Sequence, residues 1–357
     1  MRPKEHPDLH FDVIPKLYEA HCKVFITSLC HVQNQLKMLP RRFCRMYTTR
    51  PLANQLLLYL KSRKANINEQ DFKMVEEGQP FPLVLSDGKR LEAMLCSGSY
   101  LDNSLILLIR RQRGGRLLYC YSFMRLDNLG QLLGNATFNS WIAEGTENLY
   151  LNLSSVNKPF AHVDFDEMAN TIEEYGKENR SVVYLNLPKF GYEEMLWRLA
   201  HTHLRGHIRL DKKFAESYKC LSSDMERFEE EDCVLKVYVC GSLKGLELIY
   251  QPTQVVPMEI ENLKWSPAPT RMHLRQLCSL LRPQHIQGIV KFHSDGIVPP
   301  VPTFLKIFKA NYSPQNKEIV SRVQGEPPSK VAKVAPFRAF QARKQFQFVD
   351  DDDSNSD

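Results

Sequence analysis

Short apolar runs separated by turn signals recur along the chain, and two of them form its most regular stretch. Within residues 91–126, the runs 104–109 and 116–123 are each too short for a typical helix. Gly114 and Gly115 lie between them and supply the positive φ that a tight turn needs. The pattern therefore predicts a buried β-hairpin at this position.

The residues before this hairpin alternate between β-branched or aromatic runs and amphipathic segments. Strands are predicted at 24–27, at 46–48 and as a pair within 79–90, and a helix is predicted at 32–39. Pro51 opens a second helix. Its core-facing positions recur at helical spacing and are Leu52, Leu56, Leu57 and Leu60.

The alternation continues in the second half of the chain. A helix at 165–175 with an Asp164 or Asp166 cap, a buried strand at 181–187 and a helix at 192–203 are predicted. After an acidic linker, a strand at 233–239 is expected to begin the return to the first domain. Short strands that alternate with helices throughout predict the α/β fold class.

Composition places the chain among globular proteins. Its 357 residues, 43% hydrophobic and 25% charged, are enough for one large core or two medium ones. No apolar run approaches the roughly 20 residues that span a bilayer, and the amino-terminal residues lack the apolar segment of a signal peptide. We therefore expect neither membrane insertion nor secretion.

The cysteines and the net charge bear on the compartment of the protein and on its partners. Nine cysteines are scattered without C-x-x-C spacing, which favours reduced thiols in the cytosol or nucleus over a disulfide framework or a zinc ribbon. The net charge of +6 permits an anionic partner without requiring one. The sequence has no Gly-x-Ser-x-Gly motif for serine-based hydrolysis.

The hairpin carries a resemblance to a known family. Its first strand is preceded by Ser99-Tyr100-Leu101-Asp102-Asn103-Ser104, and its second ends in Leu118-Tyr119-Cys120-Tyr121-Ser122-Phe123-Met124. This arrangement resembles the metallo-β-lactamase core of the DNA-repair nucleases that include Artemis and Apollo. In that family the two segments read Asn-His-Cys-Pro-Gly-Ser and Leu-Tyr-Thr-Gly-Asp-Phe-Arg. The resemblance places the metal-binding His on Tyr100 and the bridging Asp on Ser122.

The family's main metal motif corresponds to the residues after the first strand. In the family that strand is followed by His-x-His-x-Asp-His, which holds two divalent ions. The equivalents here are Ser28, Cys30, Val32 and Gln33. His31 lies one place out of register, so Cys30-His31 is either a metal-ligand pair or a buried thiol beside a surface imidazole.

Two further metal positions fall in later segments. A strand that ends in a metal-coordinating Asp in the family ends here in Asn152. Residues 263–292 resemble a Pro-Tyr-Ser-x-His-Ser-Ser pattern followed by a helix and Leu-Lys-Pro, with Leu281-Arg282-Pro283 keeping the helix stop and Ala268 at the metal-binding His. The family's Gly-Lys-Glu motif corresponds loosely to Gly191-Tyr192-Glu193 in this chain, so the lysine is absent. Every family ligand is therefore replaced.

The resemblance implies a domain organisation. It predicts a metallo-β-lactamase αββα sandwich of two sheets with helices outside, into which a β-CASP-like α/β domain is inserted. The predicted boundaries are 1–156 for the first part of the sandwich, 157–232 for the insert and 233–303 for the returning part. Residues 304–357 are predicted to be a disordered tail, because Pro, Lys and Gln dominate much of it.

Basic residues are candidates for contact with nucleic acid. They are Arg41, Arg42, Arg45, Arg110, Arg111, Arg113 and Arg116. The four at the hairpin tip either bind phosphates or form a solvated strand end. If the arginines line a cleft between the domains, weak and salt-dependent DNA binding is expected, and if they scatter, binding should be negligible.

Two other clusters allow alternative interpretations. His203 and His207 share a helix face, as a metal pair would, or mark a helix end at Gly206. In the tail, Phe337, Phe340, Phe346 and Phe348 lie between basic residues and the acidic end at 350–353. They form either a docking motif for a partner protein or part of a solubilising tail.

Three functions follow from the resemblance. The first is a catalytically inactive relative of the nucleases, without a metal cofactor, acting in the nucleus as a binding or scaffold protein in DNA repair or telomere protection. The second is an active 5′-3′ DNA exonuclease with displaced ligands from Cys30, His31, Asn152 and Asp102 or Asp127. The third is another hydrolase of the wider metallo-β-lactamase class, which meets the same shortage of ligands.

Overall fold

The computed structural model describes residues 1–33, 35–111, 114–122, 133–157, 164–179, 181–218, 220–221, 234–240, 258, 263–289 and 298–310. The chain divides into two compact units, Met1–Tyr312 and Ser313–Asp357. The second unit lies outside the described residues, and so do the four tail phenylalanines. The first unit belongs to the α/β class, as the sequence predicts.

A four-stranded parallel sheet forms from the amino-terminal residues, in the order β1-β2-β3-β4. Its strands are β1 (Leu9–Phe11), β2 (Lys23–Phe25), β3 (Arg45–Thr48) and β4 (Phe72–Met74). The helix α2 (Arg50–Ser62) has a proline in its first turn and connects β3 to β4, with the short 3-10 helix η2 (Glu69–Asp71) before β4. The four leucines predicted to face the core are buried.

A six-stranded mixed sheet has the order β13-β9-β8-β7-β6-β5. Its strands are β5 (Phe81–Val84), β6 (Arg90–Ser97), β7 (Leu105–Arg111), β8 (Gly114–Cys120), β9 (Asn148–Leu151) and β13 (His285–Gly288). The predicted hairpin is confirmed, because β7 and β8 are antiparallel and Gly114 and Gly115 have φ of 77° and 72°.

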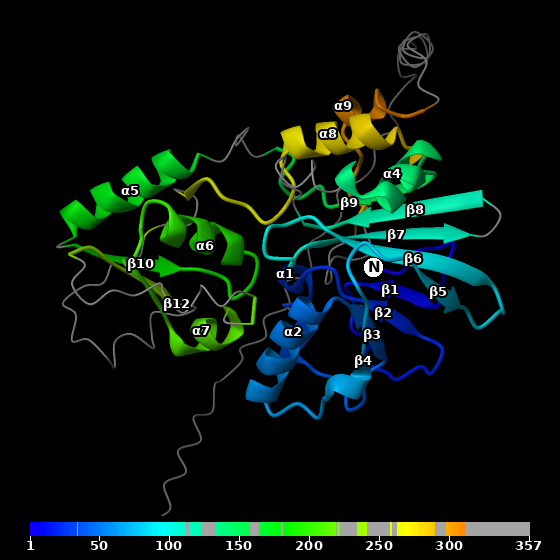
Figure 1. Ribbon diagram of the computed structural model, residues 1–357, viewed down its shortest axis with the longest axis horizontal. Helices are drawn as coiled ribbons and strands as arrows, with labels where there is room; N and C mark the ends of the chain where they lie inside the picture. Colours follow the sequence, from blue (N-terminus) through cyan, green and yellow to red (C-terminus); the bar gives the residue numbers. More distant parts are fainter. Residues whose placement is uncertain are drawn as a thin grey trace, which may run out of the picture. The chain divides into compact units, whose positions relative to one another are not determined.

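The two sheets face each other across one core, which includes the ring contacts of Phe25 with Phe81 and of Phe11 with Tyr119. On the opposite face of β2 and β3, Val24 and Met46 are buried in the same cluster as the apolar side of α2. The outer face of the six-stranded sheet packs against α4 (Ala136–Ala143) and α8 (Arg271–Leu281). The order of layers is thus helix, sheet, sheet, helix (Figure 1).

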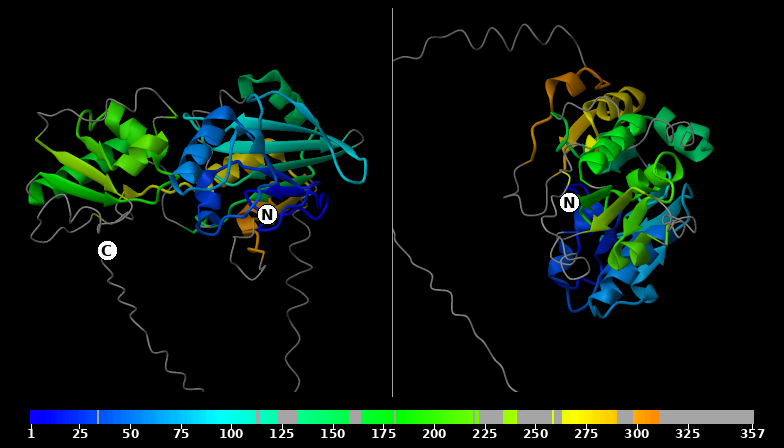
Figure 2. Two further views of the ribbon diagram at one scale, coloured as in Figure 1. Left: turned by 90° about the horizontal axis from the view of Figure 1, so that it is seen from below. Right: turned by 90° about the vertical axis from the view of Figure 1, so that its left-hand side faces the viewer.

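A separate group of elements surrounds a three-stranded parallel sheet of order β10-β12-β11 (Figures 1 and 2). Its strands are β10 (Val182–Asn186), β11 (Ile208–Leu210) and β12 (Lys236–Cys240). Its helices are α5 (Phe165–Glu178), α6 (Glu193–His201) and α7 (Lys212–Tyr218). Asp164 caps α5 by accepting hydrogen bonds from the backbone N–H groups of Asp166 and Glu167. We call these elements the insert.

The strand predicted at 233–239 does not begin the return to the first domain. As β12, it lies between β10 and β11 at the centre of the insert. Met258, Leu263 and Trp265 pack in the same core. The insert therefore extends beyond the predicted boundary at 232.

Two local predictions also differ from the structure. In place of one helix at 32–39, the chain forms the four-residue α1 (Leu29–Val32) and the 3-10 helix η1 (Gln35–Lys37). The predicted tail begins too early, because Thr303–Lys306 form α9 and Leu305 is fully buried against the outer helical layer. The end of α8 at Arg282 is as predicted, with φ of 41°.

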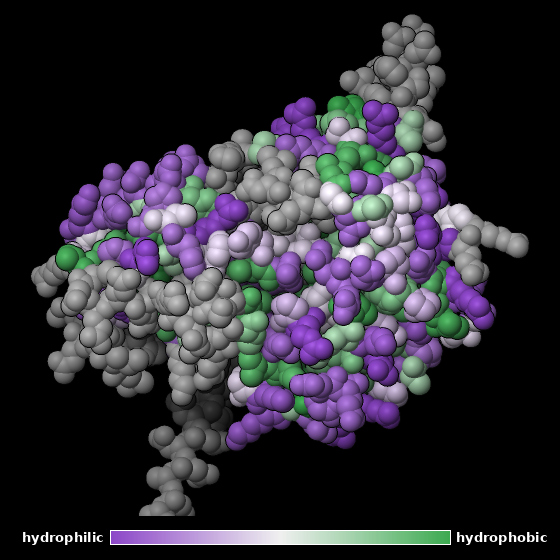
Figure 3. All heavy atoms as spheres, in the orientation of Figure 1, coloured by the Kyte–Doolittle hydropathy of each residue, from purple (hydrophilic) through white to green (hydrophobic). Residues whose placement is uncertain are grey.

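Hydrophilic and hydrophobic side chains are interspersed on the face of the molecule that Figure 3 shows. Among the residues that the structure describes, none of the helices has the length and apolarity needed to cross a membrane.

Candidate functional site

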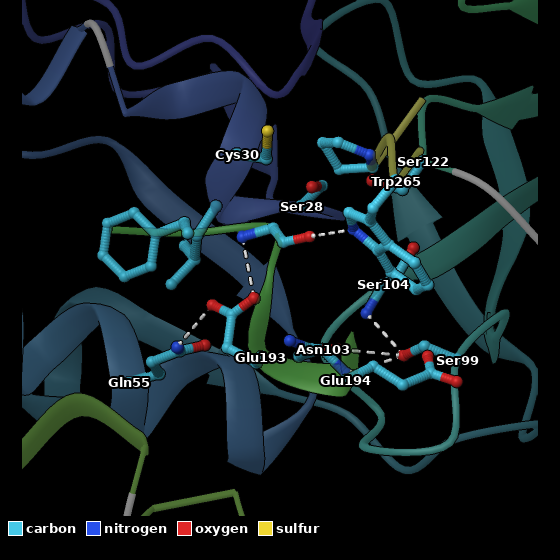
Figure 4. A pocket seen from close by; sticks show the side chains of 14 residues that line it. Ser28, Cys30, Gln55, Ser99, Asn103, Ser104, Ser122, Glu193, Glu194 and Trp265 are labelled. Carbon is cyan, nitrogen blue, oxygen red and sulfur yellow. Dashed lines mark hydrogen bonds between the residues drawn. The ribbon is translucent and has the colours of Figure 1, made fainter. Parts of the chain in front are cut away.

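A small pocket lies where the carboxyl end of β2, the end of β8 and the start of α6 meet (Figure 4). We call it the central pocket. Its volume is about 30 Å³, which suits about two water molecules, since one needs roughly 10–15 Å³. Its lining residues include Ser28, Cys30, Gln55, Ser99, Ser104, Ser122, Gly191, Glu193, Glu194 and Trp265.

The wall formed by the first part of the chain is tied together by Ser99. Its hydroxyl oxygen accepts from the backbone N–H groups of Asn103 (3.2 Å) and Ser104 (3.1 Å). Ser104 also forms an isolated antiparallel bridge with Ser28. These bonds fix the loop between β6 and β7 against the residues that follow β2.

The wall formed by the insert carries a buried carboxylate. Glu193 is the first residue of α6 and accepts from Gln55 Nε2 (3.0 Å) and from the backbone N–H of Gly191 (2.7 Å). Burial raises the pKa of Glu193 above its usual value, although these hydrogen bonds oppose the shift. Trp265 closes the same side by donating its indole N–H to the carbonyl of Gly191 (3.2 Å). The walls of the pocket are therefore formed and held by both parts of the chain.

Gly191 has a position that only glycine fits. Its φ is +100°, and an added Cβ would lie 3.1 Å from Cys30 Sγ and 3.0 Å from Pro267 Cβ. The backbone of the insert thus approaches the residues after β2 as closely as packing allows.

A second buried carboxylate, Asp12, lies behind the pocket at the end of β1. It is fully buried and accepts from the backbone N–H of Thr27 (2.6 Å), the Thr27 hydroxyl (2.6 Å) and the backbone N–H of Ser28 (3.2 Å). The Tyr119 hydroxyl of β8 donates to it at 3.0 Å, and His31 Nδ1 lies 3.7 Å away. Asp12 thus joins the two sheets and fixes the residues that precede Cys30.

Asp12 and Tyr119 are not among the site residues that the sequence predicts. The available signal is position: Asp12 directly follows the apolar strand β1, and the carboxyl ends of neighbouring parallel strands meet at one edge of a sheet. Its partner Tyr119 is 107 positions away. No local pattern identifies such a pair.

Three of the eight positions aligned with metal ligands meet in the central pocket. They are Ser28, Cys30 and Ser122. Val32 is buried in the hydrophobic cluster that also includes β2, β3 and α2. Asn152 is buried and accepts from the backbone N–H of Ser154 (3.0 Å), and Ala268 is buried beside the Ser266 hydroxyl.

The two remaining positions contact the insert. The side-chain oxygen of Gln33 accepts from the backbone N–H of Phe190 at 3.3 Å. Tyr100 lies 4.5 Å from the Trp197 ring of α6, centre to centre. Positions aligned with metal ligands thus hold the insert against the first part of the chain.

The side chains at this position do not fit a zinc or two-metal centre. Zinc takes thiolate, imidazole or carboxylate ligands, usually three or four of them. The pocket offers serine hydroxyls, Cys30, whose thiol pKa is raised by burial to about 12, and the carboxylates of Glu193 and Glu194. Glu193 already accepts from Gln55 and Gly191, and Glu194 lies 3.7 Å from Arg198. Among the described residues, no three His, Cys, Asp or Glu side chains are grouped so that they could hold a metal ion.

The displaced-ligand arrangement is also not assembled. His31 is buried with its ring stacked on Tyr121 at 3.8 Å, and Asn152 is engaged with Ser154. Asp102 lines a different pocket, with Thr49 and Glu76. Asp127 lies outside the described residues.

The candidate arginines do not line the central pocket. Arg110 pairs with Glu92 (2.6 Å) and Arg116 with Glu144 (2.6 Å). These residues lie at the tip of the β7–β8 hairpin, about 20 Å of strand away from Ser122. Arg41, Arg42 and Arg45 are exposed before and at the start of β3, whereas the pocket lies at the carboxyl end of the neighbouring β2. Arg111 is exposed at the same hairpin tip, and Arg113 lies outside the described residues.

The histidine cluster is a helix end with separate partners. Helix α6 ends at His201, and Gly206 has φ of +76°. His203 Nε2 lies 2.5 Å from Asp166, and His207 Nδ1 lies 2.9 Å from the carbonyl of Leu235. The two rings therefore do not share a helix face.

No protein-family model matches this chain, and no curated protein matches it significantly.

Proposed function

We propose that this protein is a catalytically inactive member of the metallo-β-lactamase/β-CASP nuclease class. The helix, sheet, sheet, helix order and the α/β insert support this assignment. The positions aligned with the main metal motif fall at the carboxyl end of β2, next to the end of β8. In this proposal the fold is retained for binding rather than for hydrolysis.

The observation that carries the proposal is the small size of the central pocket. A site for a nucleotide-sized ligand typically has roughly 300–1,000 Å³, whereas this pocket has about 30 Å³. Next to the pocket, Gln33 and Tyr100 contact Phe190 and Trp197 of the insert, and the backbone at Gly191 leaves no room for a side chain. Neither the ligand set nor the space supports phosphodiester hydrolysis there.

The proposed role is that of a scaffold in the nucleus, in DNA repair or telomere protection, with protein partners that dock on the tail phenylalanines. The resemblance of the chain to the repair nucleases is the basis for this part. A binding role agrees with the contacts of Gln33 and Tyr100, two positions aligned with metal ligands, which join the first part of the chain to the insert.

Metal content and nuclease activity of the purified full chain test the proposal. We expect less than one zinc ion per chain when the metal content is measured by mass spectrometry. We also expect no degradation of 5′-phosphorylated single- or double-stranded DNA with Mg²⁺, Mn²⁺ or Zn²⁺. One or more equivalents of metal, lost together with activity in Cys30→Ala, would overturn it.

DNA binding gives a separate prediction. Because the candidate arginines lie on different parts of the surface and two are already ion-paired, we expect negligible binding at moderate salt. A titration of labelled DNA at low and moderate salt measures this. The triple reversal Arg41→Glu, Arg42→Glu, Arg45→Glu and the double reversal Arg110→Glu, Arg111→Glu should each leave the result unchanged. Tight binding that resists salt would contradict the prediction.

A further inference from the structure

Two cysteines face each other at the amino ends of neighbouring strands. Lys23 of β2 and Arg45 of β3 are register partners in the parallel sheet. Cys22 and Cys44 each precede those residues by one position and so continue the same register. Neighbouring strands lie roughly 4.8 Å apart, which is inside the Cα separation of about 4.4–6.8 Å that disulfides use.

The two thiols are neighbours, and neither takes part in a disulfide in the structure. Cys44 is close enough to help raise the pKa of Cys22. Their exposed fractions are 3% and 2%, and Cys44 Sγ also lies 3.9 Å from the carbonyl oxygen of Leu17. Other buried cysteines are placed differently. Cys96 faces Ile106 on the adjacent strand, and the Cys120 thiol donates to the carbonyl of Ser122 at 3.2 Å.

The segment before β2 lies beside this pair, since the Leu17 carbonyl is 3.9 Å from Cys44 Sγ. This segment forms a turn, in which Cys22 N–H donates to the carbonyl of Glu19 at 3.1 Å. The side chain of Leu17 in this turn is 78% exposed. A local opening of the turn therefore exposes the thiols without unfolding the sheet beneath them.

We propose that Cys22 and Cys44 are a modification site, which forms a reversible disulfide when the protein meets a hydroperoxide. One thiolate attacks the peroxide oxygen, the O–O bond breaks, and a sulfenic acid and hydroxide form. The second thiol then displaces water from the sulfenic sulfur. Two thiols lose two electrons and two protons, and hydrogen peroxide becomes two molecules of water. Burial raises the pKa of Cys22 to about 12, so the thiolate is scarce and the reaction is slow.

The disulfide would close the segment that carries the central pocket. Residues 22–44 include Ser28, Cys30 and Gln33, as well as Thr27 and His31 beside Asp12. A cross-link that closes a loop of this size reduces the conformational entropy of the unfolded chain and so stabilises the folded state. We expect oxidation to raise the melting temperature by roughly 5 °C. This inference is independent of the proposed function, because it concerns the amino ends of the strands and not the metal positions.

The test uses the full chain treated with hydrogen peroxide, alkylated under denaturing conditions and digested with trypsin without reductant. Cleavage after Lys16, Lys23, Arg42 and Arg45 gives a peptide 17–23 joined to a peptide 43–45, which separate on reduction. We expect this pair to be the main cross-link, with the Cys96 peptide still alkylated.

Matched variants distinguish the disulfide from general oxidation. The increase in melting temperature should be absent in Cys22→Ser and in Cys44→Ser, retained in Cys96→Ser, and reversed by dithiothreitol in the unmodified chain. Fully alkylated Cys22 and Cys44 after peroxide treatment would overturn the proposal. An equal increase in Cys22→Ser and the unmodified chain would also overturn it.

Discussion

Replacing Asp12 with alanine is expected to lower the free energy of unfolding by about 3–5 kcal/mol, the cost of removing one partner from a buried charged network. The substitution leaves the Thr27 backbone N–H, the Thr27 hydroxyl and the Tyr119 hydroxyl without their acceptor. It also places alanine at φ of 49°, where the left-handed conformation is unfavourable for it. Urea denaturation of both proteins measures the difference.

Asp12→Asn is the matched control for this prediction. Asparagine tolerates the left-handed conformation, and its carbonyl oxygen can still accept from the Thr27 and Ser28 backbones. The Thr27 and Tyr119 hydroxyls can rotate to accept from its amide group. We therefore expect a loss of only about 1 kcal/mol. Equal losses in Asp12→Asn and Asp12→Ala would show that the charge, and not the hydrogen-bond geometry, stabilises the fold.

The same carboxylate has a defined pH dependence. Burial acts to raise the pKa of Asp12, but the nearby His31 imidazole and the hydrogen bonds from Thr27 outweigh it and hold the pKa below its ordinary value. Because the folded pKa is lower than the unfolded one, the stabilisation is present above about pH 4 and is lost as the pH falls further.

Local patterns in the sequence predict most of the elements that surround the site. Gly114 and Gly115 define the hairpin, and the leucine spacing after Pro51 defines α2, because turn geometry and helical periodicity are local properties. The strand at 233–239 shows the limit. Its apolar pattern predicts a strand, but its partners β10 and β11 are fixed by packing with distant residues.

The site shows the same division. Ser28, Cys30 and Ser122, which the resemblance aligns with metal ligands, line one pocket in the structure. What replaces the ligands could not be predicted, since Gln33 meets Phe190 across 157 positions and Gln55 meets Glu193 across 138. Contacts of that separation depend on how the insert packs, which residue spacing does not encode.

Replacing Glu193 gives the second large effect, because this carboxylate is buried in the wall of the pocket that the insert forms. Glu193→Ala leaves Gln55 Nε2 and the Gly191 backbone N–H without their acceptor. It also creates a void beside α2. We expect a loss of about 2–4 kcal/mol in the free energy of unfolding, measured by urea denaturation at pH 7.

Glu193→Gln should behave in the opposite way. The Oε1 atom of Gln55 is buried and has no hydrogen-bond partner. If the Gln55 amide turns over, it can accept from the new amide N–H₂, while the new carbonyl accepts from Gly191. A buried charge is removed and the number of hydrogen bonds made with Gln55 and Gly191 stays the same, because the unpartnered atom of Gln55 changes from Oε1 to Nε2. Stability at pH 7 should therefore be unchanged or higher.

The pH dependence of the two proteins decides between these outcomes. Burial raises the folded pKa of Glu193 above its unfolded value, so its favourable contribution is present at low pH and is lost as the pH rises through the folded pKa. Between pH 5 and 8, the slope of stability against pH should therefore be less negative in Glu193→Gln than in the unmodified chain. A Glu193→Gln variant as unstable as Glu193→Ala, with an unchanged slope, would mean that the ionised carboxylate itself holds α6 against α2.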